Sequence, residues 1–293
     1  MSNRYRAEID GLRGIAVLAV ILYHAEIIIN GNHLFSGGFF GVDIFLVISG
    51  FLITRIILAE YKKDKKISFR NFYERRFKRL VPALILVLII SSIFSYFILL
   101  PNQFIFFLKS VFFSIFFISN FFFHYSGESY GQSILTHIPL LHTWSLSIEE
   151  QFYLIYPLFL ILIFKFGKKN IKFILVVFIF LSFLFVLLIN KNHGSFNFYM
   201  LPSRGWELLL GALLAITEKD KNYQLNSNLK SFLSFLGLCL IIFSFIFFDG
   251  INNHPGYKTL LPVIGTCLII FCSDSKTFVY KVLSFKILKN LGL

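Results

Sequence analysis

Long apolar runs separated by short polar stretches organise the whole chain. Each run is close to the roughly 20 residues that an α-helix needs to cross the hydrocarbon core of a bilayer. The nine runs lie at about 12–29, 37–59, 81–100, 104–123, 148–166, 172–190, 199–217, 231–248 and 259–273. This pattern predicts an all-α fold, a polytopic bundle of transmembrane helices.

Lysine and arginine are concentrated in alternate connections between these runs. The connection at 60–80 holds nine of them, whereas 30–36 and 124–147 hold none. Cytoplasmic loops of membrane proteins carry an excess of positive charge. We therefore expect 60–80 and the N-terminus to be cytoplasmic and 124–147 to face the outside.

One connection conflicts with a simple count of crossings. If 81–100 and 104–123 both crossed the membrane, the basic connection at 165–172 would lie outside. We therefore expect 81–123 to cross once overall, with one of its two apolar stretches interfacial or re-entrant. About eight full crossings then remain, with both termini cytoplasmic.

Composition narrows the class of protein further. The 293 residues are 57% hydrophobic and 15% charged, with a mean hydropathy of +0.75, which is typical of a polytopic membrane protein. The net charge of +13 does not indicate nucleic acid as a partner, because most charges lie in short loops between apolar runs. Three cysteines without metal-site spacing predict neither a disulfide framework nor a metal cofactor. We interpret 1–293 as one domain.

Ionisable residues inside apolar runs are costly, so each is a candidate for function. Arg13 and His24 stand eleven residues apart. That spacing is close to three helical turns and places both on one helix face, about 16 Å apart along the axis. They are candidates for lining one wall of a path through the membrane. An arginine at a helix start and a histidine at the membrane interface would also explain the pattern.

Asp43 follows Gly37, Gly38 and Gly41 near the start of the second run. Small residues allow helices to approach closely, and a buried carboxylate needs a partner, for which His24 or an arginine is the candidate. Compensation of the helix dipole by an acid in the first turn is the alternative.

Arg76 and Arg79 stand three residues apart where the third run begins. Arginine binds phosphate through parallel hydrogen bonds, so the pair is a candidate phosphate site. Cytoplasmic topology alone would also place basic residues here.

Polar residues crowd the start of the fifth run, in the stretch LLHTWSLSIEEQFYLIYP. It contains Trp144, and Ser147 is a candidate helix cap with Glu149 and Glu150 in the first turn. Capping explains one of these acids more readily than two, so both are candidates for a site.

A further candidate pair lies in LPSRGWELLLGALLA. Arg204 and Glu207, three residues apart, are expected to pair on one helix face. The pair is either structural or closes a polar cavity.

These stretches, in their order along the chain, resemble the membrane acyltransferase family 3, the bacterial integral-membrane O-acyltransferases of surface polysaccharides. The resemblance runs from Tyr5 to the C-terminus. The motifs that carry it are YRAEIDGLRGIAVLAVILYHA, GGFFGVDIFLVISGFLIT, FYERRFKRLVPAL, LLHTWSLSIEEQFYLIYP, SRGWELLLGALLA and HPGYKTLLPVIGTCLII.

The resemblance implies a reaction in the bacterial inner (cytoplasmic) membrane, surrounded by membrane lipids. An acyl group, foremost acetyl from cytoplasmic acetyl-CoA, would pass to a hydroxyl of a cell-surface glycan or lipid-linked saccharide. The matching functional residues are the catalytic Arg13 and His24, the donor-linked Arg76 and Arg79, the acid Glu149 and the late Arg204.

In such a reaction His24 would act as the general base or carry the acyl group transiently. Asp43 or Glu149 would fix the tautomer of His24, a choice that the sequence leaves open. Arg13 would stabilise the thioester oxygen or a phosphate of coenzyme A.

Members of this family normally continue with a further helix that opens on a Ser-Tyr-Ser-Leu-Tyr-Leu-Trp-His type motif, and many carry an esterase-like domain of the SGNH type. This chain stops at FKILKNLGL, where that motif is expected, so we expect it to lack both. Two alternatives to an active acyltransferase stay open. They are a transporter or flippase of glycan intermediates, with the same charges along its path, and an inactive truncated remnant.

Overall fold

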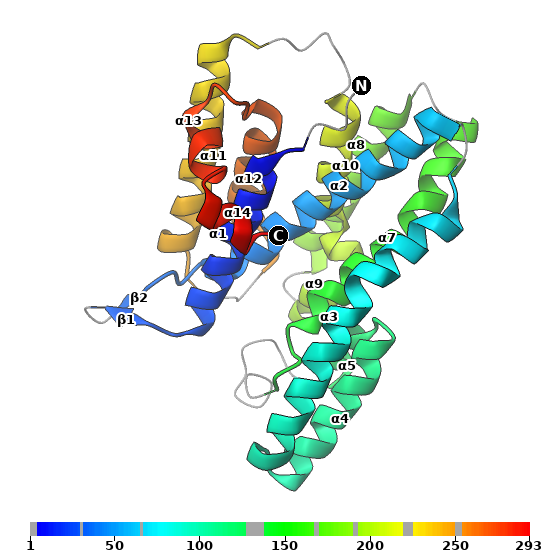
Figure 1. The fold of residues 1–293 in the computed structure, drawn as a ribbon, viewed down its shortest axis with the longest axis vertical. Coiled ribbons are helices and arrows are strands. Elements are labelled where there is room, and N and C mark those ends of the chain that lie inside the picture. Colours follow the sequence, from blue (N-terminus) through cyan, green and yellow to red (C-terminus); the bar gives the residue numbers. More distant parts are fainter. Residues whose placement is uncertain are drawn as a thin grey trace.

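The computed structural model describes residues 5–29, 32–64, 67–126, 138–166, 170–189, 193–218, 225–249 and 254–293. These residues are almost entirely helical, and one short antiparallel hairpin is the only sheet among them (Figure 1). The predicted all-α class is confirmed.

The first half of the chain begins with a helix, a small hairpin and a long second helix. Its elements are α1 (Ala7–His24), β1 (Ile28–Ile29), β2 (Asn32–His33), the 3₁₀ turn η1 (Gly38–Phe40), α2 (Gly41–Asp64), α3 (Phe69–Ile98), α4 (Pro101–Ile115) and α5 (Ser119–Tyr125).

The second half is helical throughout the part that the structure describes. Its elements are α7 (Thr143–Phe166), α8 (Ile171–Ile189), α9 (Gly194–Tyr199), α10 (Leu201–Thr217), α11 (Ser227–Phe247), the 3₁₀ turn η3 (Tyr257–Thr259), α12 (Leu260–Cys272), α13 (Phe278–Leu283) and α14 (Lys286–Leu291).

Among the described residues, five helices are long and apolar enough to cross a membrane by length and composition: α2, α3, α7, α8 and α11. The molecule is therefore a multi-pass membrane protein. The count of eight crossings stays a prediction, because length and composition do not place a helix across the bilayer.

The centre of the molecule is the crossing of α2 with α10. Gly50 of α2 faces Leu208 of α10, and Gly211 of α10 faces Val47 of α2, so closely that a Cβ at either glycine would collide with the facing carbonyl oxygen. Small residues permit this approach between membrane helices. The crossing holds together the two helices that carry Asp43, Arg204 and Glu207.

α1 lies against η1 and α2 on one side and against α13 and α14 on the other (Figure 1). A Cβ added at Gly38 or Gly41 would collide with the carbonyl oxygens of Ala19 or Ala16 in α1. The predicted close approach at these glycines is confirmed.

α3, α4 and α5 form an arm that extends from the rest of the molecule, in the lower part of Figure 1. α4 has 15 residues and α5 has 7, and Phe117 between them has a φ of 55°. At 1.5 Å per residue, neither helix reaches the roughly 30 Å of a hydrocarbon core. The apolar stretch at 104–123 is therefore two short helices.

The predicted cap of α7 is wrong. The helix begins at Thr143, so Ser147 lies inside it and donates to the Thr143 carbonyl at 3.1 Å. The Ser147 hydroxyl also accepts from Ser119 of α5 at 2.9 Å, and Ser119 accepts from the Thr143 hydroxyl at 2.9 Å. A hydroxyl buried between apolar helices is stabilised by such contacts, and here they join α5 to α7.

Candidate functional site

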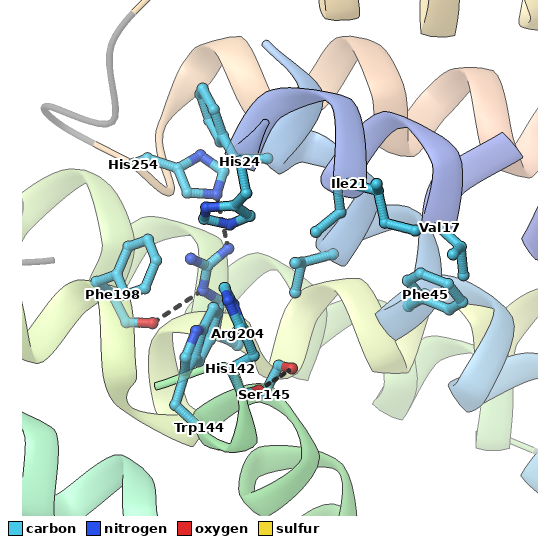
Figure 2. A pocket seen from close by; sticks show the side chains of 13 residues that line it. Val17, Ile21, His24, Phe45, His142, Trp144, Ser145, Phe198, Arg204 and His254 are labelled. Atoms are coloured by element: carbon cyan, nitrogen blue, oxygen red, sulfur yellow. Dashed lines mark hydrogen bonds between the residues drawn. The ribbon is translucent and has the colours of Figure 1, made fainter. Parts of the chain in front are cut away.

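A cavity of about 200 Å³ lies between α1, α2, α7 and α10. Figure 2 shows its two kinds of wall: apolar side chains gather on one side and nitrogen-bearing side chains at one end. The apolar side includes Val17, Ile21 and Phe45, and the polar end includes His24, His142 and Arg204.

Two histidine rings meet at the polar end. His24 is the last residue of α1 and His142 directly precedes α7, and their ring centroids lie 4.5 Å apart in an edge-to-face contact. Burial at the end of the cavity, together with the neighbouring His24, lowers the pKa of His142 to about 4. At neutral pH His142 is therefore an uncharged imidazole with one N–H donor and one acceptor nitrogen.

Arg204 is completely buried at the same end of the cavity. Its Nε donates to the Phe198 carbonyl at 3.1 Å, and its Nη1 lies 2.8 Å from Asp43 Oδ1 and 3.5 Å from Glu207 Oε1. Asp43 and Glu207 are also fully buried, and buried charges are tolerated when they are paired in this way. The predicted pairing of Arg204 with Glu207 is confirmed, and the expected arginine partner of Asp43 is Arg204.

His254, in the loop before η3, completes this cluster. Nη1 of Arg204 lies 3.0 Å from His254 Nε2. A guanidinium group can only donate, so Nε2 accepts and the ring proton is on Nδ1, which lies 3.3 Å from the Thr259 hydroxyl. Burial lowers the pKa of His254, in agreement with this uncharged tautomer.

Aromatic rings enclose the Arg204 guanidinium. Its carbon lies 5.3 Å from the centroid of the Trp144 ring and 5.0 Å from that of Phe198, distances at which cation–π attraction acts. Among the described residues, Nη2 of Arg204 has no hydrogen-bond partner. The cation–π contact joins α10 to Trp144 at the start of α7.

A second polar cluster lies toward the other end of α1. Glu149 of α7 accepts a hydrogen bond from Tyr153 at 3.1 Å, is hydrogen-bonded to Ser49 of α2, and interacts electrostatically with Arg13 and Arg76. The Arg76 guanidinium packs on the Tyr153 ring, 4.6 Å from its centroid. Three candidates from separate motifs therefore lie within electrostatic reach of one another: Arg13, Arg76 and Glu149.

Arg13 and His24 both lie on α1, with the predicted spacing of about 16 Å along the helix axis, and each belongs to a different cluster. Arg76 is half-buried against α7, whereas the Arg79 side chain is exposed. Glu150 lies beside Glu149, within electrostatic reach of Arg76.

Sequence reasoning missed two residues of the cavity, His142 and His254. Both stand inside motifs that were recognised, LLHTWSLS and HPGYK, so the motifs were the available signal. Their pairing with His24 and Arg204 spans 118 and 50 residues, and no local pattern reports contacts of that length.

These groups are suited to proton transfer and to binding oxygen atoms. Neutral imidazoles donate and accept hydrogen bonds at once, and a fixed guanidinium contributes positive potential without changing its protonation state. Within the described ranges, no group of three or more His, Cys, Asp or Glu side chains is arranged to hold a metal ion.

Comparison with known proteins gives matches over nearly the whole chain. A family model described as an acyltransferase domain matches residues 6–292. The peptidoglycan O-acetyltransferase OatA of Listeria monocytogenes is 35% identical over 99% of this chain and 48% of its own length. The O-acetyltransferase OatA of Staphylococcus aureus is 37% identical over 73% of this chain and 35% of its own length. The chain thus spans about half the length of the Listeria protein. No solved structure gives a significant match.

Proposed function

The chain belongs to the acyltransferase-domain family, and on that premise we propose that it transfers an acyl group from acyl-CoA to a hydroxyl of a cell-envelope glycan. The observation that carries the proposal is the cavity in which His24 and His142 meet beside buried Arg204. Acyl transfer from a thioester to an alcohol needs a base for the alcohol and donors for the oxygen that becomes negative. The cavity contains both kinds of group.

The proposed acyl group is acetyl and the proposed acceptor is a peptidoglycan-type glycan. Support comes from the printed names of the relatives, which are O-acetyltransferases and, for the Listeria protein, a peptidoglycan O-acetyltransferase. The cavity of about 200 Å³ is small enough to favour a short acyl group over a long one.

The donor is proposed to enter from the cytoplasm. The segment at 60–80, with its nine basic residues, lies on the cytoplasmic side by the positive-inside rule. Arg76 and Arg79 lie within this segment, in the first half of α3, and the anionic phosphates of coenzyme A suit the exposed Arg79. In this orientation the N-terminus is cytoplasmic, and the membrane is the bacterial cytoplasmic membrane.

The acceptor is proposed to reach His24 from the outer side. His24 lies at the far end of α1 from the cytoplasmic N-terminus, next to the outward connection that precedes α7. The acceptor hydroxyl gives its proton to His24 as its oxygen bonds to the acyl carbon, and the carbon–sulfur bond to coenzyme A breaks. The proton then passes from His24 to the leaving thiolate, which restores the neutral ring.

The test is transfer of labelled acetyl from acetyl-CoA to peptidoglycan fragments by the purified protein in proteoliposomes. We expect wild-type protein to acetylate the glycan. We expect His24→Ala to lose about 10²–10⁴-fold in rate, the usual contribution of a positioned general base.

The matched control is His193→Ala, at an exposed histidine that precedes α9. It should transfer acetyl at the wild-type rate. Undiminished transfer by His24→Ala would overturn the assignment of the base. Transport of a labelled lipid-linked saccharide into vesicles without any acetyl transfer would favour the flippase alternative.

A further inference from the structure

We propose that His142 is a second catalytic group of the cavity, whose ring N–H binds the acyl carbonyl oxygen while His24 takes the proton of the acceptor hydroxyl. This inference rests on the proposed acyl transfer and adds a division of work between the two imidazoles. It concerns a residue that the sequence motifs did not single out as functional.

The first support is the placement of the two rings. His24 ends α1 and His142 directly precedes α7; their ring centroids lie 4.5 Å apart, and both line the same cavity of about 200 Å³. Figure 2 shows both side chains at the polar end of that space. A ligand atom at this end therefore lies beside two imidazole rings, one from the end of α1 and one from the residue before α7.

The second support is that the backbone around His142 is fixed by neighbouring contacts. Its carbonyl oxygen accepts a hydrogen bond from the Ser145 hydroxyl at 3.2 Å. Two residues along, the buried Trp144 ring packs on Phe198, with centroids 4.6 Å apart, and faces the Arg204 guanidinium. An oxyanion donor needs such a fixed position, because its benefit comes from not having to reorganise during the reaction.

The third support is electrostatic. Two imidazoles in contact near a buried guanidinium do not both carry a positive charge, because like charges in a desolvated place repel. A neutral imidazole still offers one N–H donor, and a neutral histidine that polarises a carbonyl is a known solution to this problem in another enzyme. One ring can therefore act as base and the other as donor.

Two further donors were candidates for the carbonyl oxygen. Nη1 of Arg204 already contacts Asp43, Glu207 and His254, while its Nη2, which has no hydrogen-bond partner among the described residues, can donate alongside His142. Arg13, expected from the family resemblance to stabilise the thioester oxygen, lies about 16 Å along α1 from His24. In this proposal the donor role passes from Arg13 to His142.

The chemical step balances with these two groups. The acceptor O–H proton moves to His24, the oxygen–carbon bond forms, and the carbonyl oxygen becomes negative while it accepts a hydrogen bond from His142. When the carbon–sulfur bond breaks, the carbonyl re-forms and the thiolate takes the proton from His24. His142 keeps its own proton throughout.

The test compares His142→Leu, which removes the N–H donor, with His142→Gln, which retains one in the side-chain amide. We expect His142→Leu to lower kcat about 10²–10³-fold, the effect of removing one oxyanion donor. The KM values for acetyl-CoA and for the glycan should stay nearly unchanged. The kcat of His142→Gln should be about tenfold or more above that of His142→Leu. Leucine and glutamine at His193 are the matched controls and should change neither constant.

A second readout separates an oxyanion contact from a structural role. Fluoroacetyl-CoA forms a less basic oxyanion, which accepts a weaker hydrogen bond, so the loss caused by His142→Leu should be smaller with this donor than with acetyl-CoA. A variant that only disturbs the fold loses the same factor with both donors. If His142→Leu does not reach the membrane, His142→Ala takes its place in both measurements.

The outcomes are distinct from those of the proposed function. Suppose that the wild-type protein transfers acetyl and that this transfer depends on His24. The role of His142 is then wrong if His142→Leu keeps the wild-type kcat, if its kcat falls by the same factor with both donors, or if its kcat equals that of His142→Gln. In each of these cases the proposed acyl transfer stands. If the wild-type protein transfers no acetyl, the proposed function itself fails.

Discussion

Two polar clusters lie along α1, and they differ in what they leave open. At the His24 end, imidazole groups border a cavity of about 200 Å³. At the Arg13 end, cations face acids: Arg13 and Arg76 interact with Glu149, and Tyr153 both packs under Arg76 and donates to Glu149. The His24 end has a cavity bordered by imidazole rings, whereas at the Arg13 end the positive side chains face negative ones.

Under the proposed acyl transfer, this difference separates two tasks. A reacting alcohol needs a neutral base and room for the acyl group, which the His24 end provides. An anionic donor needs cations that remain available, and Arg79 of α3 is exposed and has no ion pair among the described residues. The Arg13 cluster joins side chains from α1, α2, α3 and α7.

The largest effect should come from breaking the buried pair behind the cavity. Arg204→Gln removes the cation that faces Asp43 and Glu207, all three of them fully buried. Leaving a buried charge without its partner costs about 3–5 kcal/mol. We expect a strongly lowered melting temperature of the detergent-solubilised protein.

Two comparisons sharpen this prediction. Adding Asp43→Asn to Arg204→Gln should restore part of the stability, because the uncompensated charge is then smaller. Arg76→Gln, in the other cluster, should cost only about 1–2 kcal/mol, because Arg13 still faces Glu149 and Arg76 is half-buried. If Arg204→Gln and Arg76→Gln lowered the free energy of unfolding equally, the difference between the fully buried Arg204 cluster and the partly exposed Arg76 cluster would be contradicted.

Much of the fold could be predicted because a membrane helix depends on residues that are close together in the sequence. Runs of apolar residues predicted the helices of the bundle, and the glycines before Asp43 predicted the close approach of α1. The pairing of Arg204 with Glu207 was predictable for the same reason, because residues three apart share a helix face.

The remainder depends on contacts between distant segments. Ser147 has the residue type of a cap, but its hydroxyl bonds to Ser119 of α5, and only the packing of α5 on α7 reveals this partner. Asp43 and Arg204 are 161 residues apart in sequence and 2.8 Å apart in the structure. The cavity arises where four helices meet, so no single motif could show that His142 lies beside His24.

An intermediate effect should distinguish the cations of α3 from one another. Arg79→Gln should raise the KM for acetyl-CoA about tenfold with little change in kcat, the loss of one charge-assisted hydrogen bond. Arg75→Gln is the matched control, because Arg75 already pairs with Glu60 at 2.8 Å. Steady-state kinetics and competition by free coenzyme A measure the change. A KM for Arg79→Gln that matches the Arg75→Gln value would remove Arg79 from the donor site.

The smallest effect concerns protons at the cavity. The pKa of His142 is lowered to about 4 by burial and by His24, whereas a histidine in an unfolded chain titrates near 6.5. Between these values the unfolded chain binds a proton that the folded protein does not, so the contribution of His142 to stability is complete above pH 6.5 and is lost as the pH falls toward 4.

We therefore expect the melting temperature of the wild-type protein to fall more between pH 7 and pH 5 than that of His142→Gln, by roughly 1–3 °C. The other lowered histidine outside the helices, His254, titrates in both proteins and cancels in this difference. His193→Gln, at the exposed histidine before α9, should follow the wild-type curve. If wild type and His142→Gln lost stability in parallel, the ring of His142 would be solvated like an exposed histidine, and the desolvated end of the cavity would be contradicted.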